Sequence, residues 1–221
     1  MKRRTSAEEE EIRMRVEVHR QRMRERYIED QQYLEREGIM VYPHNPEKLD
    51  LSDNLLICSS ISNILHKPIL QVFFDFVDTL QVSNQPISSS GRSLYPSDPI
   101  SINNTITIDR PPTHPGVVDI DGYFGSQRVE RILGNRQYDK IMFLFCDHDI
   151  YLVYEEHESD IPEDIRHIWS CVNTHLRPNG IVVLFEITDQ LLNYLESRYG
   201  IVYETSQKVV SFTKVHVLRK I

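Results

Sequence analysis

Three aspartates follow short apolar runs, and they are the residues best placed for chemistry. Asp109 closes the run TITID, Asp121 follows VVDI, and Asp147 follows KIMFLFC. When such runs form parallel strands, their carboxyl ends meet at one edge, where open α/β sheets bind their ligands. At that edge Asp147 can act as a general base or orient a substrate. The alternative is that residues 146–149 form only a polar loop leaving the strand.

A second set of residues, His167, Cys171 and His175, recurs every four positions and so lies along one face of a predicted helix. Imidazole and thiolate groups bind zinc, but helical drift separates the outer two residues, and the sequence offers no fourth ligand. We therefore interpret the three residues as the half-exposed flank of a helix and predict no metal site.

Several familiar motifs are incomplete or missing. The sequence GYFG at 122–125 lacks the Lys and Ser/Thr of a P-loop and matches no complete dinucleotide-binding fingerprint. There is no G-x-S-x-G elbow for serine hydrolysis and no aromatic motif of an RNA-recognition sheet. These observations argue against four common classes of α/β and RNA-binding protein.

The candidate residues are positioned by apolar runs that alternate with amphipathic segments. Unbroken apolar runs are typical of parallel strands covered on both faces. No helix separates the last two runs, so the last strand must turn back antiparallel. The sequence predicts an α/β, Rossmann-like, seven-stranded and mostly parallel sheet with 140–146 at its centre. The predicted strands are 54–58, 105–109, 117–120, 140–146, 181–185, 201–205 and 209–218; the predicted helices are 64–80, 126–133, 163–176 and 189–199.

Residues 1–38 differ from the rest of the chain. From 7 to 37 there is no Pro or Gly, most residues favour a helix, and Gly38 supplies a stop. The apolar stripe of this charged N-terminal helix is too narrow for a core helix. It is predicted either to lie solvated along the domain or to bind RNA or a protein partner through residues 7–37. Residues 39–221 are predicted to form the α/β domain, with a long Ser/Pro/Asn-rich loop at 83–104.

The composition indicates a globular protein from a reducing compartment. The 221 residues suffice for one domain and an appendage, and the formal charge of −8 argues against coating nucleic acid through net charge alone. No apolar run approaches the ~20 residues of a membrane span, the N-terminus does not resemble a secretory signal, and the 3 cysteines cannot form a disulfide framework. We predict an intracellular protein, of the cytoplasm or nucleus, with no membrane contact.

The segments YDKIMFLFCD and LRPNGIVVLFE resemble the second half of a class I S-adenosylmethionine-dependent methyltransferase. TITIDRP is similar to the second strand of that family, and VVDIDGYFGSQRVERIL to its third strand and following helix. Over residues 50–221 the spacing is closest to the FtsJ-like ribose 2′-O-methyltransferases. The resemblance implies S-adenosylmethionine as cofactor and RNA ribose as substrate. It places Asp109 at the cofactor ribose, Asp121 near the adenine, and Asp147 at the catalytic aspartate.

The sequence departs from the family at several positions. The turn after the first strand, CSSISNILHK, has no glycine; Ser59, Ser60 and Ser62 can hydrogen-bond a cofactor, but their Cβ atoms crowd its approach. Glu186 stands where FtsJ-like enzymes place a lysine, and Lys48 is a poor candidate for their first lysine. Two hypotheses stay open: a methyltransferase acting on RNA or a nucleotide-like substrate, and a catalytically inactive methyltransferase-fold scaffold whose N-terminal helix binds a protein partner.

Overall fold

A computed structural model describes residues 46–58, 67–80, 99–109, 118–144, 161–185, 187–210 and 213–221, together with Met14 and Val18. The chain divides into two compact units, Met1–Met40 and Val41–Ile221. In the first unit Met14 and Val18 are helical and exposed. The predicted boundary at residue 38 and the helical arm remain predictions.

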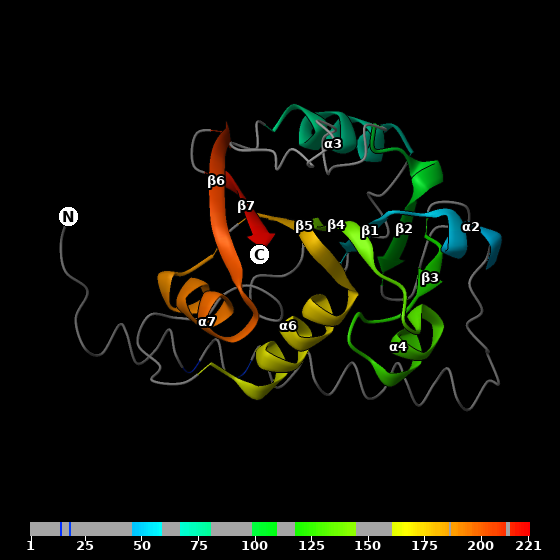
Figure 1. The fold of residues 1–221 in the computed structure, drawn as a ribbon. Coiled ribbons are helices and arrows are strands. Elements are labelled where there is room, and N and C mark those ends of the chain that lie inside the picture. The colour runs from blue at the N-terminus through cyan, green and yellow to red at the C-terminus, as the bar shows by residue number, and fades with distance from the viewer. Residues whose placement is uncertain are drawn as a thin grey trace, which may run out of the picture. The chain divides into compact units, whose positions relative to one another are not determined.

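The second unit is built on a seven-stranded sheet in the order β3-β2-β1-β4-β5-β7-β6 (Figure 1). The first five strands are parallel, and β7 runs antiparallel to both β5 and β6. Both features were predicted, as was the central place of β4. The strands are β1 (Asn54–Cys58), β2 (Thr105–Asp109), β3 (Ile120–Asp121), β4 (Tyr138–Leu144), β5 (Leu176–Leu184), β6 (Ile201–Val210) and β7 (Thr213–Lys220).

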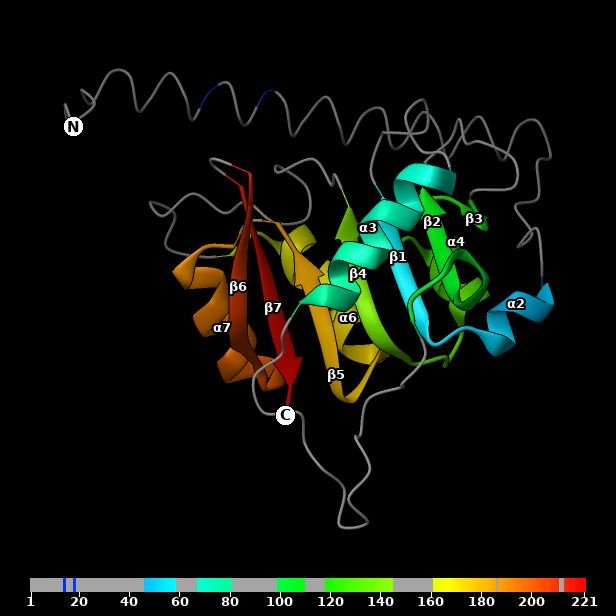
Figure 2. The ribbon, with the colours of Figure 1, turned by 90° about the horizontal axis from the view of Figure 1, so that it is seen from above.

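Helices cover the sheet on both faces, α3 on one and α4, α6 and α7 on the other (Figure 1). Seen from above, α3 crosses the sheet diagonally (Figure 2). The division follows from chain order, because right-handed crossovers that step in opposite directions along a sheet place their helices on opposite faces. The helices are α2 (Pro46–Leu51), α3 (Lys67–Thr79), α4 (Gln127–Leu133), α6 (Glu163–His175) and α7 (Asp189–Tyr199), with a 3₁₀ turn, η1 (Ile102–Asn104).

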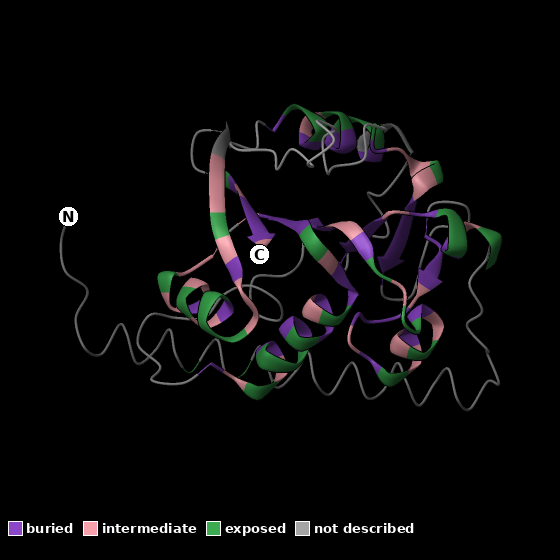
Figure 3. Cartoon of the chain, viewed as in Figure 1, coloured by how far each residue is buried: buried purple, intermediate pink, exposed green. Residues whose placement is uncertain are grey.

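The core consists of one apolar layer on each face of the sheet. Alternate residues of a strand belong to opposite layers: Leu55 and Ile57 pack toward α4 and α6, whereas Leu56 and Cys58 pack toward α3. All residues of β1 and β2 are buried, whereas the edge strand β6 and the outer sides of the helices are partly or fully exposed (Figure 3). Cys58 at the end of β1 is buried and is a free thiol.

Several predicted boundaries were wrong, among them the start of β4, which is Tyr138 instead of Lys140. The strand expected at 117–120 is only Ile120–Asp121, because Asp119 leaves the strand ladder and its side-chain Oδ2 accepts the backbone N–H of Thr107 at 2.9 Å. Residues 209–210 belong to β6 instead of the last strand, since Val210 pairs with Thr213 across a tight hairpin. The strand expected at 181–185 already begins at Leu176 as β5, which has a bulge between Leu176 and Ile181.

Gly180 within this bulge has no room for a side chain. A Cβ there would lie 2.9 Å from the carbonyl oxygen of Arg177, 3.0 Å from that of Asp139 and 2.8 Å from Leu176 Cδ1. Two of these contacts are backbone atoms that cannot rotate away. We expect Gly180→Ala to lower the free energy of unfolding by about 1–3 kcal/mol, measured by urea denaturation. An unchanged unfolding midpoint would contradict the crowding of this bulge.

Candidate functional site

The sheet has a topological switch point between β1 and β4. From β1 the chain moves to β2 on one side, whereas β4 and β5 extend the sheet on the other. In open α/β sheets, ligands bind in the crevice at the carboxyl ends of the strands beside such a point. Cys58 pairs with Leu144 here, so β1 and β4 end side by side. We take this carboxyl edge as the candidate site.

Asp109 and Asp121 lie at the same edge, on neighbouring strands. They are partners in the register of β2 and β3, so their Cα atoms are separated by about the 4.8 Å that divides adjacent strands. Asp109 is fully buried and Asp121 is partly exposed. The backbone N–H of Gly122 donates to the carbonyl oxygen of Asp109 at 2.7 Å, which ties the residue after Asp121 to β2. The structure thus brings together two of the predicted site residues.

The GYFG segment after Asp121 has a structural role. A Cβ on Gly122 would lie 2.7 Å from Val129 Cγ2, and Gly125 has a φ of +84°, which favours glycine. Directly after it, the hydroxyl of Ser126 accepts the backbone N–H of Val129 and caps α4. The glycines therefore allow β3 to turn tightly into α4, and this turn fixes where Asp121 lies.

The other predicted site residues are outside the described residues. This holds for Ser59, Ser60 and Ser62 in the turn after β1, and for Asp147 after β4. It also holds for Glu186, which follows β5. Their roles remain those that the family resemblance implies.

Lys48 does not face the carboxyl edge as a catalytic lysine would. Its ammonium Nζ lies 2.6 Å from Asp119 Oδ2, and both side chains are largely buried. This ion pair links α2 to the residue before β3, and it neutralises the carboxylate that accepts the backbone N–H of Thr107. Sequence reasoning missed both α2 and this role of Asp119; Pro46 at the first helical position was the available signal.

The helical set His167, Cys171 and His175 does not form a metal site. Cys171 Sγ lies 3.8 Å from His167 Nε2, but that nitrogen is 2.8 Å from the carbonyl oxygen of Gly125, to which it must donate. Burial, together with the nearby Glu130, raises the pKa of the Cys171 thiol to about 12, so the thiol is not an activated nucleophile. In the part of the chain that the structure describes, no three His, Cys, Asp or Glu side chains could hold a metal ion.

The two aspartates fit the cofactor that the fold resemblance implies. Carboxylate oxygens accept hydrogen bonds from hydroxyl and amino groups, which are the polar groups of a nucleoside. Asp109 and Asp121 present two such groups at adjacent strand ends next to the switch point. These two hydrogen-bond acceptors therefore suit the adenosine part of S-adenosylmethionine.

Comparisons with known proteins find only weak similarities. No known protein family matches the sequence, and no curated protein is similar to it. A 16S rRNA N2 G1207 methyltransferase of T. thermophilus is 11% identical, with 79% of this chain and 39% of that one covered and a TM-score of 0.38. A 1,6-didemethyltoxoflavin-N1-methyltransferase of Burkholderia thailandensis is 12% identical over 100% of this chain and 93% of that one, with a TM-score of 0.39.

A TehB-like methyltransferase of Corynebacterium glutamicum is 11% identical over 94% of this chain and 99% of that one, with a TM-score of 0.38. Similarities this weak say nothing about what this chain binds. The Rossmann-like arrangement follows from the sheet itself, with its strand order and its reversed β7. None of the helices that the structure describes is long and apolar enough to cross a membrane.

Proposed function

We propose that the domain binds S-adenosylmethionine at its carboxyl edge and is a methyltransferase. The observation that carries this proposal is the pair Asp109 and Asp121, which lie in register on neighbouring strands beside the switch point. In this proposal Asp109 accepts hydrogen bonds from both ribose hydroxyls, and Asp121 accepts one from the adenine amino group. The serines of the turn after β1 line the remainder of the cofactor site.

When bound, the cofactor supplies a methyl group on a positively charged sulfur. The protein's task is then to align an acceptor with that methyl group, and alignment alone can supply much of the rate enhancement. We assign this orienting role to Asp147, which follows the central strand. The acceptor class that we favour is an RNA ribose, because the spacing of the segments is closest to that of FtsJ-like enzymes. Residues 7–37, the predicted charged helix, are the segment proposed to contact RNA or a partner.

The cofactor proposal predicts a large loss of affinity on removal of the Asp109 carboxylate. Hydrogen bonds to charged groups contribute about 1.5–3 kcal/mol, so Asp109→Ala is expected to weaken S-adenosylmethionine binding by about 2–3 kcal/mol, or roughly 30- to 150-fold. Isothermal titration calorimetry measures this directly. The matched control is Asp75→Ala, which removes an exposed carboxylate on α3 and is expected to leave the affinity unchanged. Equal affinity in wild type and Asp109→Ala would refute the assignment.

Transfer of a labelled methyl group to RNA oligonucleotides tests the substrate. Activity that disappears on 2′-deoxy oligonucleotides would support ribose as the acceptor. Cofactor binding without transfer to any RNA would overturn the RNA proposal but keep the cofactor site. Absence of both would favour the second candidate, an inactive scaffold that binds a protein partner through residues 7–37. The glycine-free turn after β1 and the acid Glu186 are the sequence features that favour this candidate.

A further inference from the structure

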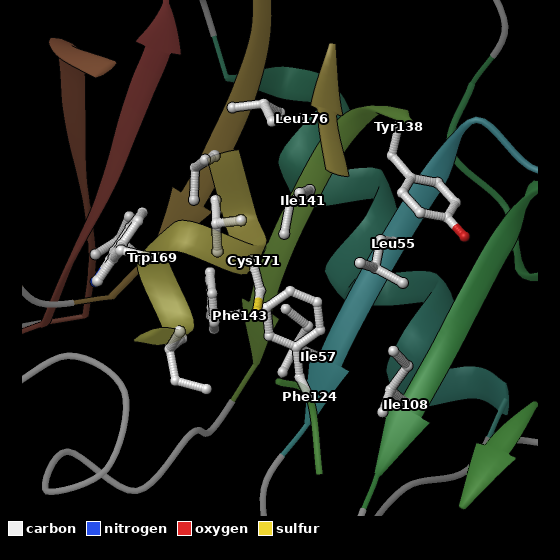
Figure 4. Packing of buried hydrophobic residues seen from close by; sticks show 14 of the residues in the cluster. Leu55, Ile57, Ile108, Phe124, Tyr138, Ile141, Phe143, Trp169, Cys171 and Leu176 are labelled. Atoms are coloured by element: carbon white, nitrogen blue, oxygen red, sulfur yellow. The ribbon is translucent and has the colours of Figure 1, made fainter. Parts of the chain in front are cut away.

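A buried histidine joins two helices at the opposite edge of the sheet from the candidate site. His175 is the last residue of α6, and its side chain is only 1% exposed. It lies next to Leu176, where β5 begins, and its ring is flanked by Phe124 and Tyr138 at centroid distances of 6.2 and 6.5 Å. Phe124 and Tyr138 belong to the apolar layer beneath α6 (Figure 4). The methyltransferase proposal makes no use of this region.

Both ring nitrogens of His175 face an oxygen atom. Nδ1 lies 2.8 Å from the backbone carbonyl oxygen of Arg136, and Nε2 lies 2.9 Å from Glu130 Oε2 on α4. A carbonyl oxygen can only accept, so Nδ1 must carry a hydrogen. A carboxylate oxygen also accepts, so a second proton is needed between Nε2 and Oε2. A neutral imidazole beside an ionised carboxylate would leave two electron-rich atoms in contact.

We propose that the buried His175 and Glu130, whose side chain is 25% exposed, form a proton-binding site, held as a carboxylate and an imidazolium, that makes the packing of α4 against α6 depend on pH. The proton satisfies both groups and links the two helices. When the proton is removed, the lone pair on His175 Nε2 faces the negative charge of the Glu130 carboxylate, and little water is there to screen the repulsion. The α4–α6 contact is therefore expected to weaken when the site loses its proton.

The groups around His175 do not supply the proton near neutral pH. Burial raises the pKa of Tyr138, on β4, to about 12, and burial with the nearby Glu130 does the same for Cys171, one turn earlier on α6. The guanidinium of Arg136 is occupied elsewhere: Nη1 donates to two carbonyl oxygens at the end of α4, and Nε and Nη2 donate to Asp50. Glu130 is thus the charged side chain that contacts the imidazole.

The direction of the effect follows from the His175 pKa. Burial alone would lower this pKa, but the hydrogen bonds to Glu130 and to the Arg136 carbonyl, with the Glu130 charge, raise it above its usual 6.5. Because the pKa is higher in the folded state, protonation of His175 stabilises the fold, and this contribution is complete below the unfolded-state pKa of about 6.5. This stabilisation decreases as the pH rises and is lost above the folded-state pKa.

Thermal unfolding of the full chain between pH 6 and 9 tests the proposal. In the wild type, Tm is expected to fall with rising pH by roughly 3–5 °C for each unit by which the folded-state pKa exceeds the unfolded one. Glu130→Gln replaces the carboxylate by an amide that can donate to a neutral Nε2, so its Tm is expected to change much less over this range. The matched control is Glu196→Gln, an exposed site on α7 with the same change of charge, which should keep the wild-type slope.

Equal slopes in wild type and Glu130→Gln would overturn the proposal. Nitrogen NMR of the wild-type His175 ring provides a second measurement that requires no variant to fold. In a titration from pH 6 to 9 we expect the ring to lose its second proton at a pH above the usual histidine pKa. Loss of that proton at or below the usual value would equally refute the proposed imidazolium.

Discussion

Replacing Ile141 by aspartate is expected to abolish folding of the domain. Ile141 is 0% exposed on the central strand β4, where it pairs with Leu55 of β1 and Val182 of β5. A carboxylate at this position would be buried with no cation at hand, either as an unpaired charge or as a protonated acid without partners. Either state costs several kcal/mol, against a typical total stability of 5–15 kcal/mol.

Circular dichroism and thermal melting measure this outcome. The conservative control is Ile141→Val, which removes one methylene group and is expected to lower the free energy of unfolding by only about 0.5–1.5 kcal/mol. A soluble Ile141→Asp protein that melts cooperatively would show that β4 is not at the centre of the fold.

Much of the fold was predictable because its strands are apolar on both faces. Such strands appear in the sequence as unbroken runs, and β1 and β2 were predicted with the observed bounds. The errors occurred where polar residues interrupt the pattern. Asp119 lies within the VVDID run, yet its side chain replaces a backbone hydrogen-bond acceptor. The Asp119 carboxylate that accepts this hydrogen bond is paired with Lys48, a residue distant in the sequence.

The candidate site was predictable only in part. Asp109 and Asp121 could be found because each follows a strand, and strand ends of a parallel sheet gather at one edge. Their mutual register needed the structure. The contact between His175 and Glu130 was not predictable, since the two residues are 45 positions apart and each alone fits an ordinary helix flank. The sequence placed His175 with His167 and Cys171, whereas its partner is on another helix.

The second large effect is expected at Trp169, the largest fully buried side chain on α6. It is 0% exposed, and its ring centroid is 5.9 Å from that of Phe143 on β4 (Figure 4). Truncation to alanine removes the buried indole and leaves a large cavity between α6 and the sheet. We therefore expect Trp169→Ala to lower the free energy of unfolding by about 3–5 kcal/mol.

Trp169→Phe separates the effect of volume from that of polarity. Phenylalanine fills most of the same space, and it also removes the indole N–H, which is buried and has no hydrogen-bond partner among the described residues. A buried donor without a partner destabilises a fold, so its removal offsets part of the lost packing. Urea denaturation followed by circular dichroism is the suitable measurement, because this is the chain's 1 tryptophan and both variants lose its fluorescence. We expect Trp169→Phe to be much closer to wild type than to Trp169→Ala; a Trp169→Ala protein as stable as wild type would show that α6 does not depend on this contact.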